Sequence, residues 1–307
     1  MAGVIFLRTN EIMGKYVIIT PARNEAAFIE NTIQSIINQT VKPLRWIVVN
    51  DGSTDSTAEI VARYESSHAF IELVNAERSG DRHFGNKVNA FNLGLEKARH
   101  IEYEFIGNLD ADISFDPDYF ERVLSEFRKD HALGLAGGMV SSLTNGEFVR
   151  QDVSLDSVAG AVQLFRRICF EQIGGYVPLP LGGIDAAAEI MARMKGWGVR
   201  TYPELCVLEH RLTGSAKASP LGSRIREGQR LYALGYDVWF FSLRCLYRLM
   251  EQPRIIGSGA ALYGFLQGLL KREPFVLPPE VVQYLRVEQR GDWLGQRVGV
   301  GAARGGG

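Results

Sequence analysis

Short β-rich runs alternate with helix-like stretches over the first two hundred residues, and this alternation limits the fold more than any other feature of the chain. The strand-like runs lie at 15–20, 45–51, 70–75 and 104–110. Helical periodicity fills the connections, with Asn24 as the candidate N-cap of a helix over 24–39. Connections of this length join parallel strands. We therefore expect an α/β fold with a mostly parallel central sheet flanked by helices.

Polar residues stand where three of these runs end, namely Thr20, Asp51 and Asp110. Open parallel sheets bind ligands just beyond the carboxyl ends of their strands, so we expect the three residues to line one crevice. No GxGxxG motif follows the first strand, and no GxxxxGK[ST] motif occurs. A nucleotide bound at this edge would therefore be held by side chains and a metal ion.

Asp110 and Asp112 flank the small Ala111, in the sequence NLDADISF. Residues i and i+2 of an extended chain point the same way, so the two carboxylates can converge. Such a pair suits a hard divalent cation that shares its coordination with substrate phosphates, and an acidic turn after a buried strand is the alternative. Asp51 is open to two interpretations as well, as a hydrogen-bond acceptor for a nucleoside or as an Asp-Gly turn.

The balance of basic and acidic residues changes after residue 210. Residues 211–307 hold twice as many Lys and Arg as Asp and Glu, whereas acidic residues outnumber basic ones before them. We expect a main domain at 1–210, a basic loop and amphipathic helical extension at 211–298, and a disordered tail at 299–307. Arg211 is interpreted as part of a solvated basic loop, with a lid over a diphosphate as the alternative.

The uncharged stretch 255–270 is shorter than the roughly 20 residues that a bilayer span needs. It either packs as an ordinary helix or lies in a membrane interface. Three widely spaced cysteines form no zinc or disulfide pattern, and the N-terminus resembles no secretory signal, which favours the cytoplasm. We expect no nucleic-acid partner.

Three segments in order, VIITPARNEAAFIENTIQSIINQT, WIVVNDGSTDSTAEIV and NLDADISF, resemble the start of a family 2 glycosyltransferase. Further matching segments extend the resemblance over at least residues 15–211. It implies the GT-A fold, with a Rossmann-like sheet and here a helical C-terminal extension. Bacterial cell-surface polysaccharide glycosyltransferases look similar in this C-terminal part, which favours peripheral contact with the inner face of the cell membrane.

The resemblance implies an inverting, metal-dependent enzyme that moves a sugar from a nucleoside-diphosphate sugar, such as a UDP- or GDP-sugar, to a hydroxyl acceptor in polysaccharide or glycolipid synthesis. A lipid-linked acceptor is one candidate. The residues implied to contact the donor are Pro21, Ala22, Arg23, Glu25, Asp51, Lys87, Asp110 and Ala111. The residues implied to hold Mg²⁺ or Mn²⁺ are Asp110, Asp112 and His210.

Asp185 matches the position of the family's catalytic base, although Ile184 replaces the customary Glu before it. Glu189, one turn further along, is the substitute candidate. Because of Ile184, a catalytically degenerate protein that binds a nucleotide-sugar without turnover is the alternative function. The QxxRW pattern of processive members is missing from the sequence, which predicts single additions.

Overall fold

The structure is a computed structural model that describes residues 14–76, 84–144, 146–151, 153–211, 219–250 and 255–299. The N-terminal segment and nearly all of the tail predicted at 299–307 lie outside the described residues. The chain divides into two compact units. They comprise Met1–Pro180 with Ile184–Ser215, and Leu181–Gly183 with Ala216–Gly307.

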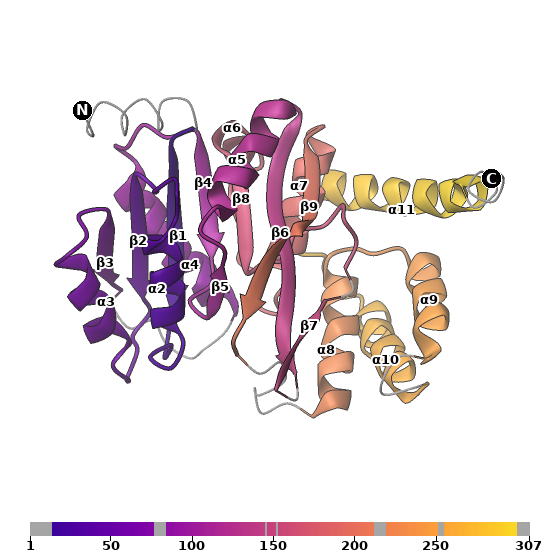
Figure 1. The fold of residues 1–307 in the computed structure, drawn as a ribbon. Helices are drawn as coiled ribbons and strands as arrows, with labels where there is room; N and C mark the ends of the chain where they lie inside the picture. The colour runs from indigo at the N-terminus through magenta and orange to yellow at the C-terminus, as the bar shows by residue number, and fades with distance from the viewer. Residues whose placement is uncertain are drawn as a thin grey trace. The chain divides into compact units, whose positions relative to one another are not determined.

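The first half of the first unit contains the expected parallel strands with helices between them (Figure 1). These elements are β1 (Tyr16–Ala22), α2 (Ile29–Ile37), β2 (Arg45–Asn50), α3 (Thr57–Glu65), β3 (Ile71–Asn75), α4 (Phe84–Ala98) and β4 (Phe105–Leu109). The strand order is β3-β2-β1-β4, and Ile19 of β1 pairs with Ile47 of β2 and Asn108 of β4. Because all four strands run the same way, their carboxyl ends meet at one edge of the sheet.

The second half adds antiparallel pairings, so the complete sheet is mixed. Its elements are β5 (Ile113–Phe115), α5 (Tyr119–Lys129), β6 (Leu133–Thr144), β7 (Glu147–Arg150), β8 (Val162–Arg166), α6 (Arg167–Gln172), α7 (Ile184–Met194) and β9 (Gly198–Glu209). The nine described strands follow the order β3-β2-β1-β4-β8-β6-β9-β5, and β7 pairs with β6. Ile113 of β5 pairs with Glu209 of β9. This pairing brings residues 110–112 beside residues 209–211, which are about a hundred positions away in the sequence.

The core of the sheet explains why one of the three expected crevice residues does not line it. Thr20 is fully buried, and its hydroxyl accepts a hydrogen bond of 2.9 Å from the indole N–H of the buried Trp46. A buried indole N–H needs such a partner, and leaving it unpaired costs about 1–3 kcal/mol. Moreover, β1 does not end at Thr20 but continues to Ala22. Thr20 is therefore a core residue.

The second unit is helical. Its elements are α8 (Pro220–Ala233), α9 (Val238–Tyr247), the 3-10 helix η1 (Arg248–Met250), α10 (Ile256–Lys271) and α11 (Pro279–Gly299). A Cβ atom added at Gly228 of α8 or Gly264 of α10 would collide with a carbonyl oxygen of the facing helix, so these glycines allow close backbone packing. None of the helices in the described ranges has the length and hydropathy required to cross a membrane.

Candidate active site

The carboxyl ends of β1 and β2 are joined by polar contacts that involve several of the predicted donor-binding residues. Pro21 and Ala22 are the last residues of β1 and pair with β2. The Asp51 backbone N–H donates to the Ala22 carbonyl oxygen at 2.9 Å. The Asp51 carboxylate lies 3.6 Å from the Arg23 guanidinium, and both side chains are mostly buried. The predicted residues of this edge are thus brought together, and they include one cation, Arg23, and one carboxylate, Asp51.

Asn24 is not the helix N-cap that the sequence predicts. It adopts a left-handed conformation with φ of 55°, which Asn tolerates better than most residues. Its side-chain oxygen accepts a hydrogen bond of 2.8 Å from the Thr54 backbone N–H, and its own N–H donates to the Ser53 hydroxyl. Asn24 thus ties the β1 loop to the β2 loop, and the helix α2 begins only at Ile29.

The segment from Asp110 to Asp112 connects β4 to β5 and is anchored on both sides. The Asp110 backbone N–H donates to the Ala161 carbonyl oxygen at 2.9 Å. Beyond it, Ile113 exchanges two hydrogen bonds with the buried Thr32 hydroxyl of α2, at 2.8 and 3.1 Å. Ala111, between the two carboxylates, is buried. These anchors fix the backbone that carries the Asp110 and Asp112 side chains.

Each of these two carboxylates faces a cation. The Lys87 ammonium of α4 contacts the Asp110 carboxylate at 2.5 Å, and the Arg211 guanidinium contacts the Asp112 carboxylate at 2.9 Å. Arg211 also forms an ion pair with Glu25 and lies over the Phe28 ring. Burial, followed by the repulsion of neighbouring carboxylates, raises the pKa of Asp110 even though Lys87 opposes the shift.

Glu25 brings a third carboxylate to this place. Its side chain is mostly buried, and burial together with the nearby Asp112 carboxylate raises the pKa of Glu25 to about 7. Arg211 acts in the opposite direction but does not cancel these effects. The three carboxylates of Glu25, Asp110 and Asp112 thus outnumber the cations that contact them, Lys87 and Arg211. An additional positive charge would therefore be stabilised there.

His210 directly follows β9, and the pairing of β9 with β5 positions it. Its backbone N–H donates to the Asp112 carbonyl oxygen at 2.8 Å, and its Nε2 lies 2.8 Å from the Ser114 hydroxyl. The ring packs edge-on against Phe148. Burial lowers the pKa of His210, so the ring is neutral near pH 7, which is the form that can bind a cation.

Asp185 lies in the first turn of α7 and belongs to the same electrostatic cluster. Its charge acts on Lys87 and on Asp110, raising the pKa of both groups. A Cβ atom added at Gly160 would lie 2.9 Å from the Asp185 carboxylate, so only glycine fits there without displacing it. The buried Asn108 of β4 holds this loop by donating to the Gly160 carbonyl oxygen at 2.7 Å.

Glu189, the substitute candidate, holds a neighbouring loop instead. Its carboxylate is buried and accepts hydrogen bonds from the Val158 backbone N–H at 2.8 Å and from the Ser157 hydroxyl at 3.2 Å. Arg193 lies 3.9 Å away. Burial raises the pKa of Glu189 to about 7. Because one Glu189 oxygen accepts both of these hydrogen bonds, Glu189 holds in place the loop that leads to Gly160.

For one residue of this site the preferred interpretation of the sequence was wrong, and another residue was not singled out. Arg211 contacts both Asp112 and Glu25, whereas a solvated loop was expected. Its position directly after His210 was the available signal. Gly160 carried no sequence signal, because its close approach to Asp185 depends on how a loop and a helix pack.

The family model for glycosyl transferase family 2 matches residues 17–174, slightly more than half of the 307 residues. This match includes the ends of β1, β2 and β4 and both aspartates of the β4–β5 connection. The chain belongs to glycosyl transferase family 2. The resemblance seen in the sequence is thereby confirmed.

Curated relatives of this family 2 protein include bacterial polysaccharide synthases, which are much longer than the matched region. Chondroitin synthase of Pasteurella multocida is 28% identical over 156 residues, which cover 47% of this chain and 15% of that protein. Poly-beta-1,6-N-acetyl-D-glucosamine synthase of Staphylococcus epidermidis is 32% identical over 115 residues, covering 38% and 26%. The chain therefore matches only a minor part of these relatives.

Solved structures confirm the GT-A fold. The mannosyltransferase PcManGT of Pyrobaculum calidifontis, in complex with GDP-Man and Mn²⁺, has a TM-score of 0.53 at 19% identity and covers 92% of this chain and 81% of its own. S. aureus TarS 1-349, in complex with UDP-GlcNAc, has a TM-score of 0.54 at 17% identity and covers 88% and 79%. At these identities the likeness concerns the fold.

The oxygen-rich cluster of this family 2 protein fits a divalent cation. Among the described residues, no group of three or more His, Cys, Asp or Glu side chains is arranged to hold a metal ion by itself. Mg²⁺ and similar cations commonly bind through one or two carboxylates and complete their coordination with substrate phosphates. Asp110 and Asp112 supply such carboxylates, and each already holds a positive group in Lys87 and Arg211. The donor set thus suits a hard cation brought together with a diphosphate.

Proposed function

We propose that the protein transfers a sugar from a nucleoside-diphosphate sugar to a hydroxyl acceptor in a single displacement that inverts the anomeric carbon. The observation that carries the proposal is the convergence of Lys87, Asp110 and Asp112 at the carboxyl end of β4, within the electrostatic reach of Asp185. Cations for a diphosphate and a carboxylate for an acceptor are the two components that this reaction requires.

The donor is proposed to lie across the carboxyl ends of β1, β2 and β4. Arg23 and Asp51 would contact the base and ribose, since their mostly buried side chains offer one donor group and one acceptor group. Lys87 and Arg211 would bind the diphosphate oxygens. The structures of PcManGT and TarS contain GDP-Man and UDP-GlcNAc, respectively, which supports a nucleotide-sugar as the donor class.

Asp110 and Asp112, with His210 beside them, would hold Mg²⁺ or Mn²⁺. When bound, the cation supplies positive charge for the leaving diphosphate. PcManGT binds Mn²⁺, which supports this cation class. The chain's own cations act in the same direction, because Lys87 and Arg211 face the place where negative charge develops.

Asp185 is proposed as the general base. It would accept the proton of the acceptor hydroxyl as the oxygen attacks the anomeric carbon from the face opposite the diphosphate, and this direction of attack produces inversion. Because Gly160 has no side chain, it leaves space for the Asp185 carboxylate. The hydrogen bond from the Asn108 side chain to the Gly160 carbonyl oxygen fixes the position of this glycine. A single polysaccharide or glycolipid chain would be extended by one sugar per encounter.

A lipid-linked acceptor and peripheral contact with the inner face of the cell membrane complete the proposal. The relatives named as polysaccharide synthases support an acceptor in cell-surface polysaccharide synthesis. The helical second unit, with its basic and aromatic residues, is the proposed region of contact.

The test is transfer or donor hydrolysis with UDP- and GDP-sugars in the presence of Mn²⁺. We expect Asp112→Asn to lose metal-dependent donor binding, and Asp185→Asn to bind donor with a turnover reduced about 10²- to 10⁴-fold. Full activity in both variants would refute the mechanism. Donor binding without any product across a broad panel of acceptors would instead identify a catalytically degenerate binding protein.

A further inference from the structure

The helix α9 carries apolar side chains on two sides. On its inward side, Phe241 stacks on Phe265 of α10 with ring centroids 4.5 Å apart, and Cys245 is buried. The exposed apolar residues at helical spacing are Trp239, Leu243, Leu246 and Tyr247. Trp239 is 77% exposed and Tyr247 is 90% exposed. An apolar stripe that faces solvent on a structured helix indicates a surface that binds something apolar.

The helix α10 packs on α9 through Phe265 and also exposes apolar side chains on the side away from its packed core. Its inward side consists mainly of glycine and alanine and lies close against α8. The exposed apolar residues at helical spacing on its other side are Ile256, Tyr263, Leu266 and Leu270. Two neighbouring helices of the second unit therefore each expose an apolar stripe that is separate from the packed core.

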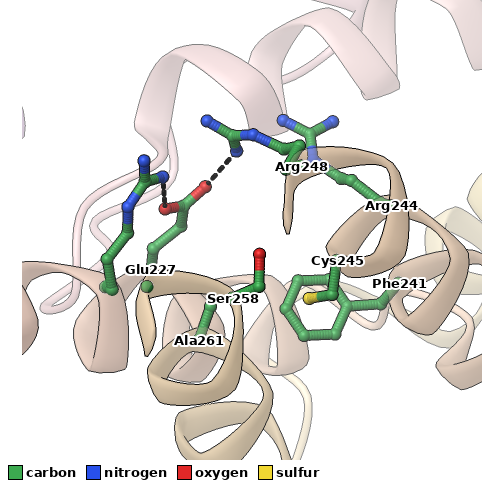
Figure 2. Close-up of a pocket in the computed structure, with 9 residues that line it drawn as sticks. Glu227, Phe241, Arg244, Cys245, Arg248, Ser258 and Ala261 are labelled. Carbon is green, nitrogen blue, oxygen red and sulfur yellow. Dashed lines mark hydrogen bonds and ion pairs between the residues drawn. The ribbon is translucent and has the colours of Figure 1, made fainter. Parts of the chain in front are cut away.

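Arginines border the stripe of α9. Figure 2 shows Arg244 and Arg248 extending over a small pocket beside Glu227 of α8. The Glu227 carboxylate accepts hydrogen bonds from Arg248 and from Arg224, both at 2.9 Å. These contacts hold Arg248 in place, and they lower the pKa of Glu227 although burial opposes the shift. In the part of the chain that the structure describes, no carboxylate lies within ion-pair distance of Arg244, which is exposed.

The pocket beneath these arginines encloses about 20 Å³, which is room for about one water molecule. The pocket is too small for a phosphate, so an anion bound by these arginines would lie at the rim, where Arg244 follows the exposed Leu243 and Arg248 follows the exposed Tyr247. An apolar stripe with guanidinium groups along one border matches the acyl and phosphate layers of a phospholipid monolayer. A second copy of the chain placed on this stripe would instead bring like charges together.

We propose that the apolar stripe of α9 inserts into the headgroup region of an anionic bilayer, and that Arg244 binds a lipid phosphate at the rim of the pocket. This inference deepens the membrane contact in the proposed function by assigning it to named residues and to anionic phospholipid. Trp239 and Tyr247 would lie at the headgroup level, which such amphipathic aromatic side chains favour.

The experiment is co-sedimentation of the full chain with vesicles of phosphatidylcholine alone or mixed equally with phosphatidylglycerol. We expect binding to the anionic vesicles, and weaker binding to the neutral ones. Arg244→Gln should weaken the anionic binding about fivefold, and Leu246→Gln about tenfold. Inorganic phosphate at constant ionic strength should not displace the protein, because a free anion lacks the acyl chains.

The matched controls are Arg63→Gln on the exposed side of α3 and Leu155→Gln in an exposed loop of the first unit, and both should bind like the unmodified protein. Unchanged binding of Arg244→Gln and Leu246→Gln, or no binding to anionic vesicles, would overturn the proposal. So would a dimer, seen by light scattering, that Leu246→Gln dissociates. Vesicle binding requires neither donor nor acceptor, so its failure is distinct from a failure of sugar transfer.

Discussion

Glu189 and Asp185 lie on the same face of α7, and replacing Glu189 by Gln separates their roles. In an unfolded chain glutamate titrates near 4.5, whereas burial raises the pKa of Glu189 to about 7 in the folded protein. The stabilisation associated with this group is fully present below about pH 4.5 and is lost as the pH rises through about 7. The difference between these values corresponds to about 3 kcal/mol.

Gln keeps the oxygen that accepts the Val158 and Ser157 hydrogen bonds but cannot ionise. We therefore expect the free energy of unfolding of Glu189→Gln, relative to the unmodified protein, to increase by up to about 3 kcal/mol between pH 4.5 and pH 8. Urea unfolding at several pH values measures it.

The matched control for this titration is Glu59→Gln, which removes an exposed carboxylate from α3 and should leave the pH dependence of the unmodified protein in place. A difference for Glu189→Gln that stays constant from pH 5 to pH 8 would refute the reasoning. Loss of sugar transfer in Glu189→Gln, together with full activity of Asp185→Asn, would identify Glu189, rather than Asp185, as the base.

Three further changes test the geometry of the site. Gly160→Ala should displace the Asp185 carboxylate and lower turnover without unfolding the protein. The control is Gly291→Ala, which should be neutral because a Cβ added there meets nothing within 4 Å. Equal turnover of both variants would contradict the contact between Gly160 and Asp185. In Arg211→Gln the guanidinium no longer competes with a cation for the Asp112 carboxylate. The donor-free variant should therefore bind Mn²⁺ several-fold more tightly than the unmodified protein, as measured by electron paramagnetic resonance. Weaker binding would show that Arg211 does not compete with the cation. Asp110→Asn should weaken metal-dependent donor binding in calorimetry, while Asp112→Asn should abolish it. The reverse order would contradict the expectation that Asp112 contributes more to the cation site than Asp110.

Local periodicity was sufficient to predict the first four strands and the helices between them. Runs such as that at 45–51 are apolar and bounded by polar residues, and their alternation with helical stretches admits only a parallel arrangement. The positions of polar residues at strand ends could be predicted as well, since Asp51 and Asp110 directly follow β2 and β4. Thr20 was assigned wrongly, because only packing shows that Trp46 requires its hydroxyl.

By itself, the sequence determined the alternating architecture, the strand-end carboxylates and the family, since these depend on residue order over short distances. The tertiary structure alone decided which cations meet those carboxylates and which loop surrounds Asp185. Arg211 reaches Asp112 only because β5 pairs with β9, and Glu25 joins them only because β1 lies beside β4. Such contacts join residues up to 186 positions apart, and no local pattern records the sheet pairing that creates them.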